Sequence, residues 1–394
     1  MRKISANYIF DGKSSFIKNG VLTIDDYNVI ISLEKNEGSF VESAGVEYYN
    51  GIMTPGFINC HCHLELSHMK GVIPPGKGLT AFIQGVSAMR NVDIEDILKA
   101  MNGAISEMSK NGIVAVGDIS NNELSFSIKE NAAMRFYTFL ECFGLNKTSE
   151  TVSYEKAHGL WEKWHNRIQL SIVPHASYSC SPLLLGRIQV DQEKHNSLFS
   201  FHNQECASEN ELFLQKRGML FDVLKKMSMD VDLLEFEGLD SVQTTSKYFP
   251  QLSKKILVHN TFTTAADLQY LSEGFELESF YWCFCPRSNM YIEGTLPDFE
   301  LFHKNKLNCV VGTDGLSSNT SLSILDELKV VAHNSKISLG ELLGWACING
   351  AHALSMGHEL GSFDPGKKPG VNLIEHVDIK EMKLLDESNV KVLI

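Results

Sequence analysis

The chain has 394 residues, of which 43% are hydrophobic and 21% charged, a composition that excludes a disordered chain, a collagen and a coiled coil. It holds 48 Asp and Glu against 35 Lys and Arg, and the net charge of -13 argues against a surface for nucleic acid or an anionic membrane. No apolar run reaches the roughly 18 residues of a membrane span. Nine scattered cysteines fit reduced thiols better than a disulfide framework, so we expect a cytoplasmic enzyme.

Short β-prone runs separated by turns occupy the beginning of the chain. They cover residues 8–10, 21–24, 29–33 and 46–49, a spacing typical of antiparallel strands. The end of the chain shows the same pattern of short β-prone runs, with predicted strands at residues 361–363, 372–374 and 390–394 around Pro-Gly turns. We therefore expect residues 1–53 and 355–394 to form one composite domain, a small β-sandwich.

Between these two ends, eight apolar runs alternate with segments of helical periodicity. Such nearly continuous runs are typical of strands that are buried on both faces of a parallel sheet. Helices are predicted over residues 94–110 and from Ser338, where Glu341 completes a capping box, to Ala351. Residues 54–354 are therefore predicted to form an α/β domain, a (β/α)8 barrel of the TIM type. The predicted strands cover residues 53–60, 113–117, 136–140, 168–173, 198–201, 256–258, 280–284 and 308–311.

Polar side chains that can bind a metal or move a proton stand at the ends of several of these runs. In a parallel barrel the carboxyl ends of all strands meet at one mouth, where barrel enzymes place their sites. Residues that are far apart in the sequence would therefore converge there. In chain order they are His61, His63, His175, His202, Glu205, His259 and Asp314.

Four of these residues form a candidate set of metal ligands. Taken alone, His202 is more often a hydrogen-bonded core residue, and Asp314 before a glycine is typical of a turn. With His61 and His63 they offer three nitrogens and one oxygen. Such a set leaves a coordination position open for water, which is the pattern of a catalytic rather than a structural site.

The remaining groups at the predicted mouth supply acid–base chemistry. Glu205 and His259 would lie beside the metal. Two titratable groups are the minimum needed to activate a water and to protonate a leaving group. Because side chains alternate along a strand, we expect Cys60 and Cys62 to pack on the face opposite His61 and His63.

The strand ends lie inside longer motifs, which follow one another along the chain. They are Thr54-Pro-Gly-Phe-Ile-Asn-Cys-His-Cys-His-Leu, Pro-His175-Ala-Ser-Tyr-Ser-Cys-Ser-Pro, His202-Asn-Gln-Glu205, Val258-His259-Asn260, Cys285-Pro-Arg-Ser-Asn289 and Gly312-Thr-Asp-Gly-Leu-Ser-Ser-Asn319. Together these motifs resemble the amidohydrolase superfamily, in the family's order and from about residue 7 to the C-terminus. Within it, the chain resembles most the mononuclear deaminases of adenosine-type compounds, guanine, cytosine and aminofutalosine, and the triazine chlorohydrolases.

The resemblance implies a role for each site residue. One Zn²⁺ or Fe²⁺ would be held by the four candidate ligands, and Asp314 would also accept a proton from the hydrolytic water. Glu205 would shuttle a proton to the ring nitrogen and the leaving group, and His259 would orient the water. His175 would contact the substrate, as would Glu141 at the end of the third barrel strand.

The predicted function is hydrolytic deamination of an amino-substituted heterocycle, a small-molecule substrate, with release of ammonia. Aminofutalosine is the first candidate, and a chlorohydrolase or cyclic-amide hydrolase on the same machinery is the alternative. A non-catalytic metal-binding barrel is the remote alternative, favoured only if a ligand or Glu205 were missing. The sequence leaves open whether the chain forms a homodimer.

Overall fold

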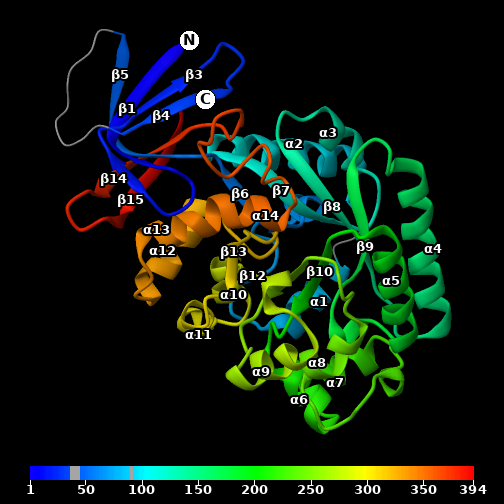
Figure 1. Ribbon diagram of the computed structural model, residues 1–394. Helices are drawn as coiled ribbons and strands as arrows, with labels where there is room; N and C mark the ends of the chain where they lie inside the picture. Colours follow the sequence, from blue (N-terminus) through cyan, green and yellow to red (C-terminus); the bar gives the residue numbers. More distant parts are fainter. Residues whose placement is uncertain (36–44, 89–91) are drawn as a thin grey trace.

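The computed structural model describes residues 1–35, 45–88 and 92–394, and Figure 1 shows two parts. A sheet built from both ends of the chain lies at one side. The larger part consists of strands and helices that alternate along the chain.

The sheet at the chain ends joins strands from opposite termini. Its order is β15-β14-β5-β1-β3-β4, with β2 paired to β1. β1 and β5 run parallel, whereas β14 pairs antiparallel with β5, Leu373 opposite Met53. The proposed domain boundaries and the sandwich arrangement stay predictions. The strands are β1 (Arg2–Phe10), β2 (Phe16–Lys18), β3 (Val21–Ile24), β4 (Ile30–Glu34), β5 (Val46–Thr54), β14 (Asn372–Asp378) and β15 (Lys383–Val392).

The eight central strands form two parallel sheets, β6-β7-β8-β9 and β10-β11-β12-β13. Backbone hydrogen bonds also join their edges, from His202 N to His175 O at 2.9 Å and from Thr313 N to His61 O at 3.1 Å. Parallel strands and α/β content are confirmed, and closure into one barrel stays a prediction. The strands are β6 (Phe57–Cys62), β7 (Ile113–Ser120), β8 (Arg135–Cys142), β9 (Gln169–Pro174), β10 (Phe199–Asn203), β11 (Lys255–His259), β12 (Phe280–Phe284) and β13 (Asn308–Val311).

Helices follow these strands and cover them (Figure 1). The predicted capping box at Ser338 and Glu341 is confirmed, and the helix it opens runs on through a π-helical turn (Trp345–Asn349). The α-helices are α1 (Leu79–Ala88), α2 (Ile94–Lys110), α3 (Phe126–Asn131), α4 (Lys147–Trp164), α5 (Pro182–His195), α6 (Ala207–Gln215), α7 (Met219–Lys226), α8 (Ser241–Thr245), α9 (Ala265–Gly274), α10 (Pro286–Ile292), α11 (Phe299–Lys304), α12 (Ile324–Asn334), α13 (Leu339–Gly344) and α14 (Gly350–Ala353).

Alternate residues of the central strands enter two different hydrophobic clusters. On β12, Cys283 packs with Ile256 and Val310 of the neighbouring strands, whereas Trp282 packs with Phe284 and the residues under the helices. Both faces of the strands are therefore buried, as the apolar runs predict.

Two predicted strands differ from the structure. The run 53–60 is divided by Pro55 and Gly56. Residues 53–54 are the end of β5, and residues 57–60 belong to β6. Proline has no backbone N–H to donate, and a side chain on Gly56 would meet the Pro369 carbonyl at 2.6 Å. The predicted strand at 361–363 is also wrong. Gly361 has a φ of +84°, and the segment turns beneath Ala351 rather than extending.

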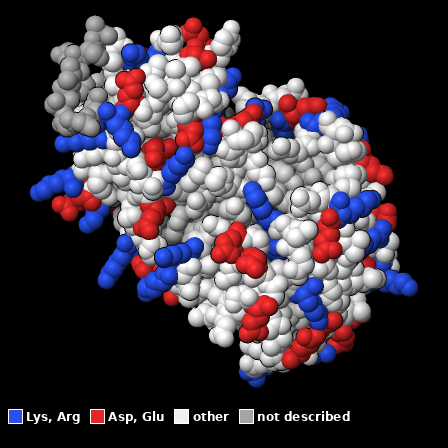
Figure 2. All heavy atoms as spheres, viewed as in Figure 1, with Lys and Arg blue, Asp and Glu red and all other residues white. Residues whose placement is uncertain are grey.

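Charged side chains of both signs are scattered over the visible surface, with broad uncharged areas between them. On the face in Figure 2, lysine and arginine side chains are interspersed with aspartate and glutamate. Among helices built from the described residues, none has the length and apolar character needed to cross a membrane.

Candidate active site

The site lies where the central strands end, and a β-bulge in β6 shapes its first part. The pairing of β6 with β7 shifts between Asn59 and Cys62, so the strict alternation of side chains is lost there. The prediction that Cys60 and Cys62 share one face is wrong for this reason. Cys60 packs with the inner cluster that holds Val310, and Cys62 packs with the outer cluster under the helices.

Three histidines and one aspartate converge at this position. His63 Nε2 lies 3.1 Å from His61 Nε2 and 3.2 Å from His202 Nε2. Asp314 Oδ1 lies 3.5 Å from His61 Nε2 and 3.4 Å from His63 Nε2. The three histidine nitrogens, from the end of β6 and from β10, thus form one group, and the Asp314 oxygen after β13 lies beside two of them, those of His61 and His63.

This geometry fits a single divalent metal. Zinc binds histidine nitrogen at about 2.0–2.1 Å, so two ligands of a tetrahedral site lie about 3.3–3.4 Å apart. The observed separations of 3.1–3.5 Å agree with that spacing. Moreover, His63 Nε2 faces two other imidazole nitrogens at once, and one N–H cannot serve both. A cation among these atoms would satisfy all of them.

The orientation of His202 leaves one nitrogen free for a ligand bond. Its Nδ1 lies 3.0 Å from the His175 carbonyl oxygen and can donate to it, so the neutral ring presents an unprotonated Nε2. Burial and the neighbouring histidines lower the pKa of His202 well below its usual value. Burial likewise lowers the pKa of His63 to about 3. Both rings are thus neutral, which metal binding requires.

Asp314 is held so that one carboxylate oxygen points to the histidines. Its other oxygen, Oδ2, accepts hydrogen bonds from Ser288 Oγ at 2.7 Å and Ser318 Oγ at 2.6 Å. The residue has a φ of +55°, which aspartate adopts only at a cost. Backbone strain of this kind is concentrated at functional sites.

Glu205 lies beside the histidine cluster and is positioned by a second glutamate. Glu209 Oε2 accepts the Glu205 backbone N–H at 3.1 Å, and its Oε1 accepts from Gln204 N at 3.2 Å and Ser177 Oγ at 2.7 Å. Burial, with the charges of Asp314 and Glu209, raises the pKa of Glu205 well above its usual value. The carboxyl group can therefore carry a proton at neutral pH.

His259 connects the cluster to Glu205. Its Nε2 lies 3.7 Å from Glu205 Oε1, and its Nδ1 lies 3.4 Å from Asn289 Oδ1. The backbone of His259 has a φ of +75° at the end of β11, and the following Asn260 also has a positive φ. Burial lowers the pKa of His259 to about 4, so its ring is neutral.

His175 and Glu141 complete the predicted set on the opposite side of His202. His175 Nδ1 lies 2.7 Å from Ser179 Oγ. Glu141 Oε1 lies 3.6 Å from His202 Nδ1, and its Oε2 accepts from Asn121 Nδ2 at 3.1 Å. Burial raises the pKa of Glu141 to about 7.

A cavity opens above these groups, and its walls are mostly apolar. Such a cavity admits a flat heterocycle, whose polar atoms would meet the few charged groups at the base. Its apolar lining comes from α1, α7 and nearby loops, and includes Leu66, Leu79, Phe82, Ile83, Val86, Phe143, Tyr178, Leu224, Met227 and Met229.

The structure brings all eight predicted site residues to this one region, and it adds residues that the sequence reasoning missed. Ser288 and Ser318 lie inside motifs that were noticed for other reasons. Glu209 follows Glu205 by four residues on the first turn of α6, a spacing that offers a weak signal. Asn121 follows β7 and carries no recognisable pattern.

A histidine and carboxylate cluster at the ends of parallel strands, beneath a small apolar cavity, defines a metal-dependent hydrolase of small molecules. The chain belongs to the amidohydrolase family, whose sequence profile matches residues 52–392.

Curated relatives cover most of the chain. An adenosine deaminase of Helicobacter pylori is 26% identical over 367 residues, which cover 89% of this chain and 87% of the relative. An aminodeoxyfutalosine deaminase of Nitratiruptor is 27% identical over 351 residues, which cover 84% and 81%.

Solved structures with low sequence identity share the fold. The aminofutalosine deaminase of Helicobacter pylori, in complex with methylthio-coformycin, gives a TM-score of 0.80 at 22% identity and covers 95% of this chain and 92% of its own. An atrazine chlorohydrolase of Arthrobacter aurescens, complexed with zinc, gives a TM-score of 0.75 at 14% identity and covers 98% and 90%.

Proposed function

We propose that the protein is a metal-dependent deaminase that hydrolyses an amino-substituted heterocycle and releases ammonia. The observation that carries this proposal is the four-atom cluster, made of the grouped nitrogens of His61, His63 and His202 and the Asp314 oxygen beside His61 and His63. Glu205 and a cavity of about 190 Å³ adjoin it. The curated relatives that act on adenosine-type compounds and aminodeoxyfutalosine support the choice of reaction. Aminofutalosine and related adenine compounds are the first substrates to test.

We propose that the four-atom cluster holds one Zn²⁺ or Fe²⁺. The chemistry that such a metal supplies is a bound water with a pKa of about 7, available as a nucleophile at neutral pH. The hydrogen bonds from Ser288 and Ser318 fix the Asp314 carboxylate, which would accept a proton from the hydrolytic water. Zinc-bound neighbours of the same fold are consistent with this assignment.

The proton transfers to the substrate fall to Glu205. It gives a proton to the ring nitrogen beside the carbon that carries the amine, then takes the remaining proton of the added water and passes it to the amine, which leaves as ammonia. The proton held by Asp314 then returns to Glu205. His259 lies between Glu205 and the histidine cluster and holds the water against the reacting carbon. His175 and Glu141 contact the heterocycle from the other side. Water adds to the carbon and ammonia departs, so the ring keeps a carbonyl oxygen where it had an amino group.

The alternatives have weaker support. The chlorohydrolase with the same fold is 14% identical, whereas the aminofutalosine deaminase with the same fold is 22% identical and the two curated deaminases are 26% and 27% identical. A non-catalytic barrel would lack part of the cluster or Glu205, and both are present.

We also propose that the eight central strands close into one barrel, with the terminal sheet beside it. We propose the cytoplasm as the location of the protein. The homodimer stays a prediction.

The test of this function is ammonia release from a panel of amino-substituted purines and pyrimidines, with the metal-loaded protein. We expect the wild-type protein to release ammonia from at least one adenine compound. Glu205→Gln should lose this release. Ammonia from none of the panel, together with release of halide from a chlorotriazine, would replace this proposal with the chlorohydrolase alternative.

A further inference from the structure

Glu65 lies two residues beyond the candidate ligand His63 and has no part in the function proposed above. It belongs to the short 3-10 helix Leu64–Met69, which follows β6. A carboxylate at this distance from a metal ligand could be a general acid or base. Among the described residues that line the cavity above the histidines, however, Glu65 is absent, whereas Asn121 and Glu141 are both present. Glu65 therefore does not meet a substrate in that cavity.

Both carboxylate oxygens of Glu65 bind the loop that follows β7. Oε2 accepts from Asn121 N at 3.1 Å and from Asn122 Nδ2 at 2.9 Å, and Oε1 accepts from Asn122 N at 3.2 Å. Because β7 ends at Ser120, these two backbone N–H groups have left the strand and need other acceptors. A charged acceptor forms stronger hydrogen bonds than a neutral one. Glu65 thus fixes the loop backbone at Asn121.

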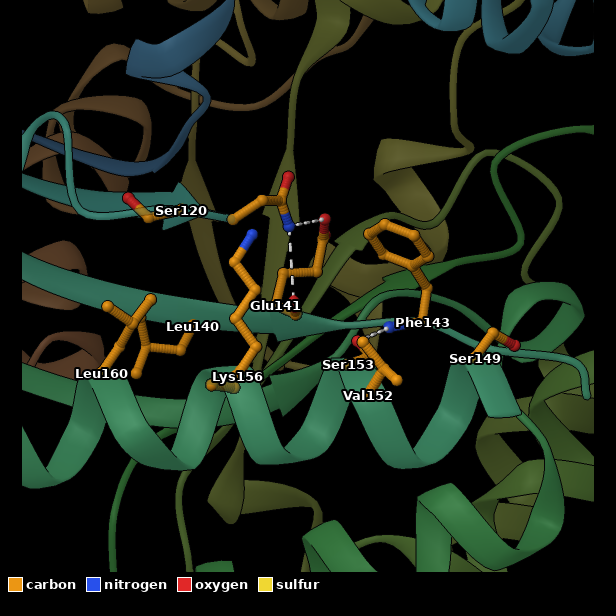
Figure 3. Close-up of a pocket in the computed structure, with 11 residues that line it drawn as sticks. Ser120, Leu140, Glu141, Phe143, Ser149, Val152, Ser153, Lys156 and Leu160 are labelled. Atoms are coloured by element: carbon orange, nitrogen blue, oxygen red, sulfur yellow. Dashed lines mark hydrogen bonds between the residues drawn. The ribbon is translucent and has the colours of Figure 1, made fainter. Parts of the chain in front are cut away.

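The Asn121 side chain in turn holds Glu141. Its Nδ2 donates to the Glu141 carbonyl oxygen at 3.3 Å and to Glu141 Oε2 at 3.1 Å, the dashed lines beside Glu141 in Figure 3. The other oxygen, Oε1, lies 3.6 Å from His202 Nδ1 and has no hydrogen-bond partner in the part of the chain that the structure describes. With Oε2 held by Asn121, the free oxygen of this buried carboxyl group stays beside His202, where a substrate can reach it.

A different side chain holds the candidate ligand His63 in place. The backbone N–H of Leu64, directly after His63, donates to Asp118 Oδ1 at 2.8 Å. This bond does not involve Glu65, whose own carboxylate contacts the loop after β7. Loss of that carboxylate is therefore expected to release Asn121 and to leave His63 among the other ligands.

We propose that Glu65 is a positioning residue, which holds Glu141 towards the substrate through Asn121 and takes no part in proton transfer. This inference rests on the proposed deaminase function and deepens it, because it assigns a carboxylate two residues from a metal ligand to substrate binding rather than to chemistry. A substitution at Glu65 then acts on the substrate only through Glu141. Two substitutions along one such chain of contacts are not additive.

The test is a double-mutant cycle with Glu65→Gln and Glu141→Gln. Glu65→Gln keeps the size of the side chain but turns an amide N–H₂ towards loop groups that are themselves donors. With an adenine compound that the wild type deaminates, we expect KM to rise by about tenfold, as for loss of a charged hydrogen bond, and kcat to change by less than about threefold. In the Glu141→Gln background, Glu65→Gln should change KM by less than about twofold. Elemental analysis should find the wild-type metal content in each variant.

Glu123→Gln is the matched control, because Glu123 lies in the same loop but binds α4. Its Oε2 accepts from Lys163 Nζ at 2.6 Å and from Trp164 Nε1 at 2.9 Å. This variant should leave KM unchanged. Glu65→Asp keeps the charge but draws it back by one carbon, and it takes the place of Glu65→Gln in the cycle if that variant does not fold.

Two results would overturn the positioning role. One is an unchanged KM in Glu65→Gln, and the other is a rise in KM that is equally large in the Glu141→Gln background. If the wild-type protein releases no ammonia from any adenine compound, the proposed function fails instead. Crystal structures of the wild type and of Glu65→Gln then decide the positioning role. Loss of the hydrogen bonds between Asn121 and Glu141 in the variant supports it, and bonds that stay as in the wild type contradict it.

Discussion

At the scale of single residues, His202→Ala provides the prediction for the metal. The substitution removes one of the four candidate ligand atoms, so we expect the purified protein to lose most of its bound metal while staying folded. Elemental analysis measures the metal per chain, with close to one equivalent expected in the wild type. His165→Ala is the control, because His165 is exposed at the end of α4 and contacts only its own helix there, through backbone carbonyls and the Trp161 ring. Full metal content in His202→Ala would refute the ligand assignment.

The site is built from side chains at strand ends, and part of it could be predicted from the sequence. His202 and His259 could be predicted because each ends a short, continuously apolar run. Glu209 and Ser288 could not, since what they do depends on partners brought near by the fold. Cys60 was misplaced for a local reason. One extra residue in β6 breaks the alternation on which the prediction depended.

At the scale of elements, a buried ion pair ties α3 to the segment that carries the candidate ligands His61 and His63. Lys129 Nζ lies 2.5 Å from Asp118 Oδ2, and both side chains are fully buried. The other oxygen of Asp118 accepts the backbone N–H of Leu64 at 2.8 Å, directly after His63. The pair therefore holds the end of β6 as well as joining β7 to α3.

Lys129→Met should reduce the free energy of unfolding by about 3–5 kcal/mol, because it leaves Asp118 charged and buried without its partner. Urea unfolding measures this change. The double variant Asp118→Asn with Lys129→Met removes the uncompensated charge and should recover part of the loss. Lys163→Met, which breaks an exposed pair, should cost less than about 1 kcal/mol. Equal losses for the buried and the exposed lysine would contradict this account.

Glu327 on α12 connects the start of α10 with the loop after β13, and its buried carboxyl group predicts a pH dependence. Its oxygens accept from Arg287 N and Asn319 Nδ2, both at 2.8 Å. Burial raises the pKa of Glu327 from 4.5 to about 8, so the folded protein holds a proton that the unfolded chain has already lost. Stability that comes from this proton is complete below pH 4.5 and is lost as the pH rises towards 8.

We therefore expect Glu327→Gln to flatten the decline of stability across this range. Urea unfolding of both proteins near pH 5 and pH 8 measures the difference. Asp326→Asn is the matched control on the same helix, because Asp326 is partly exposed. The interpretation fails if the wild type and Glu327→Gln decline by the same amount.

At the scale of the whole molecule, the candidate ligands bridge the two parallel sheets. His61 lies on β6 of the first sheet and His63 directly follows that strand, whereas His202 lies on β10 of the second sheet and Asp314 follows its strand β13. The positions of the eight strands were predictable, since each run has the length and composition of a buried strand. The pairing of β14 with β5 was not fixed by any local pattern, because antiparallel partners so far apart in sequence leave no shared signal.

Removal of the metal tests this bridging arrangement. A ligand that binds only the folded state stabilises it, so chelation should lower Tm by about 5 °C or more, and added zinc should restore it. Thermal unfolding followed by circular dichroism measures the shift. His202→Ala should show little response to the chelator. A wild-type Tm that is insensitive to complete metal removal would contradict a metal held between the two sheets.

The central claim, that Glu205 moves protons beside a metal held by other residues, is tested most directly by one measurement on Glu205→Gln. Turnover and bound metal are determined on the same preparation with an adenine compound that the wild type deaminates. The account predicts full metal content and a fall in kcat of at least about 10²–10⁴-fold, the range for loss of a general acid–base. A variant that keeps its metal and more than about a tenth of the wild-type turnover would contradict it.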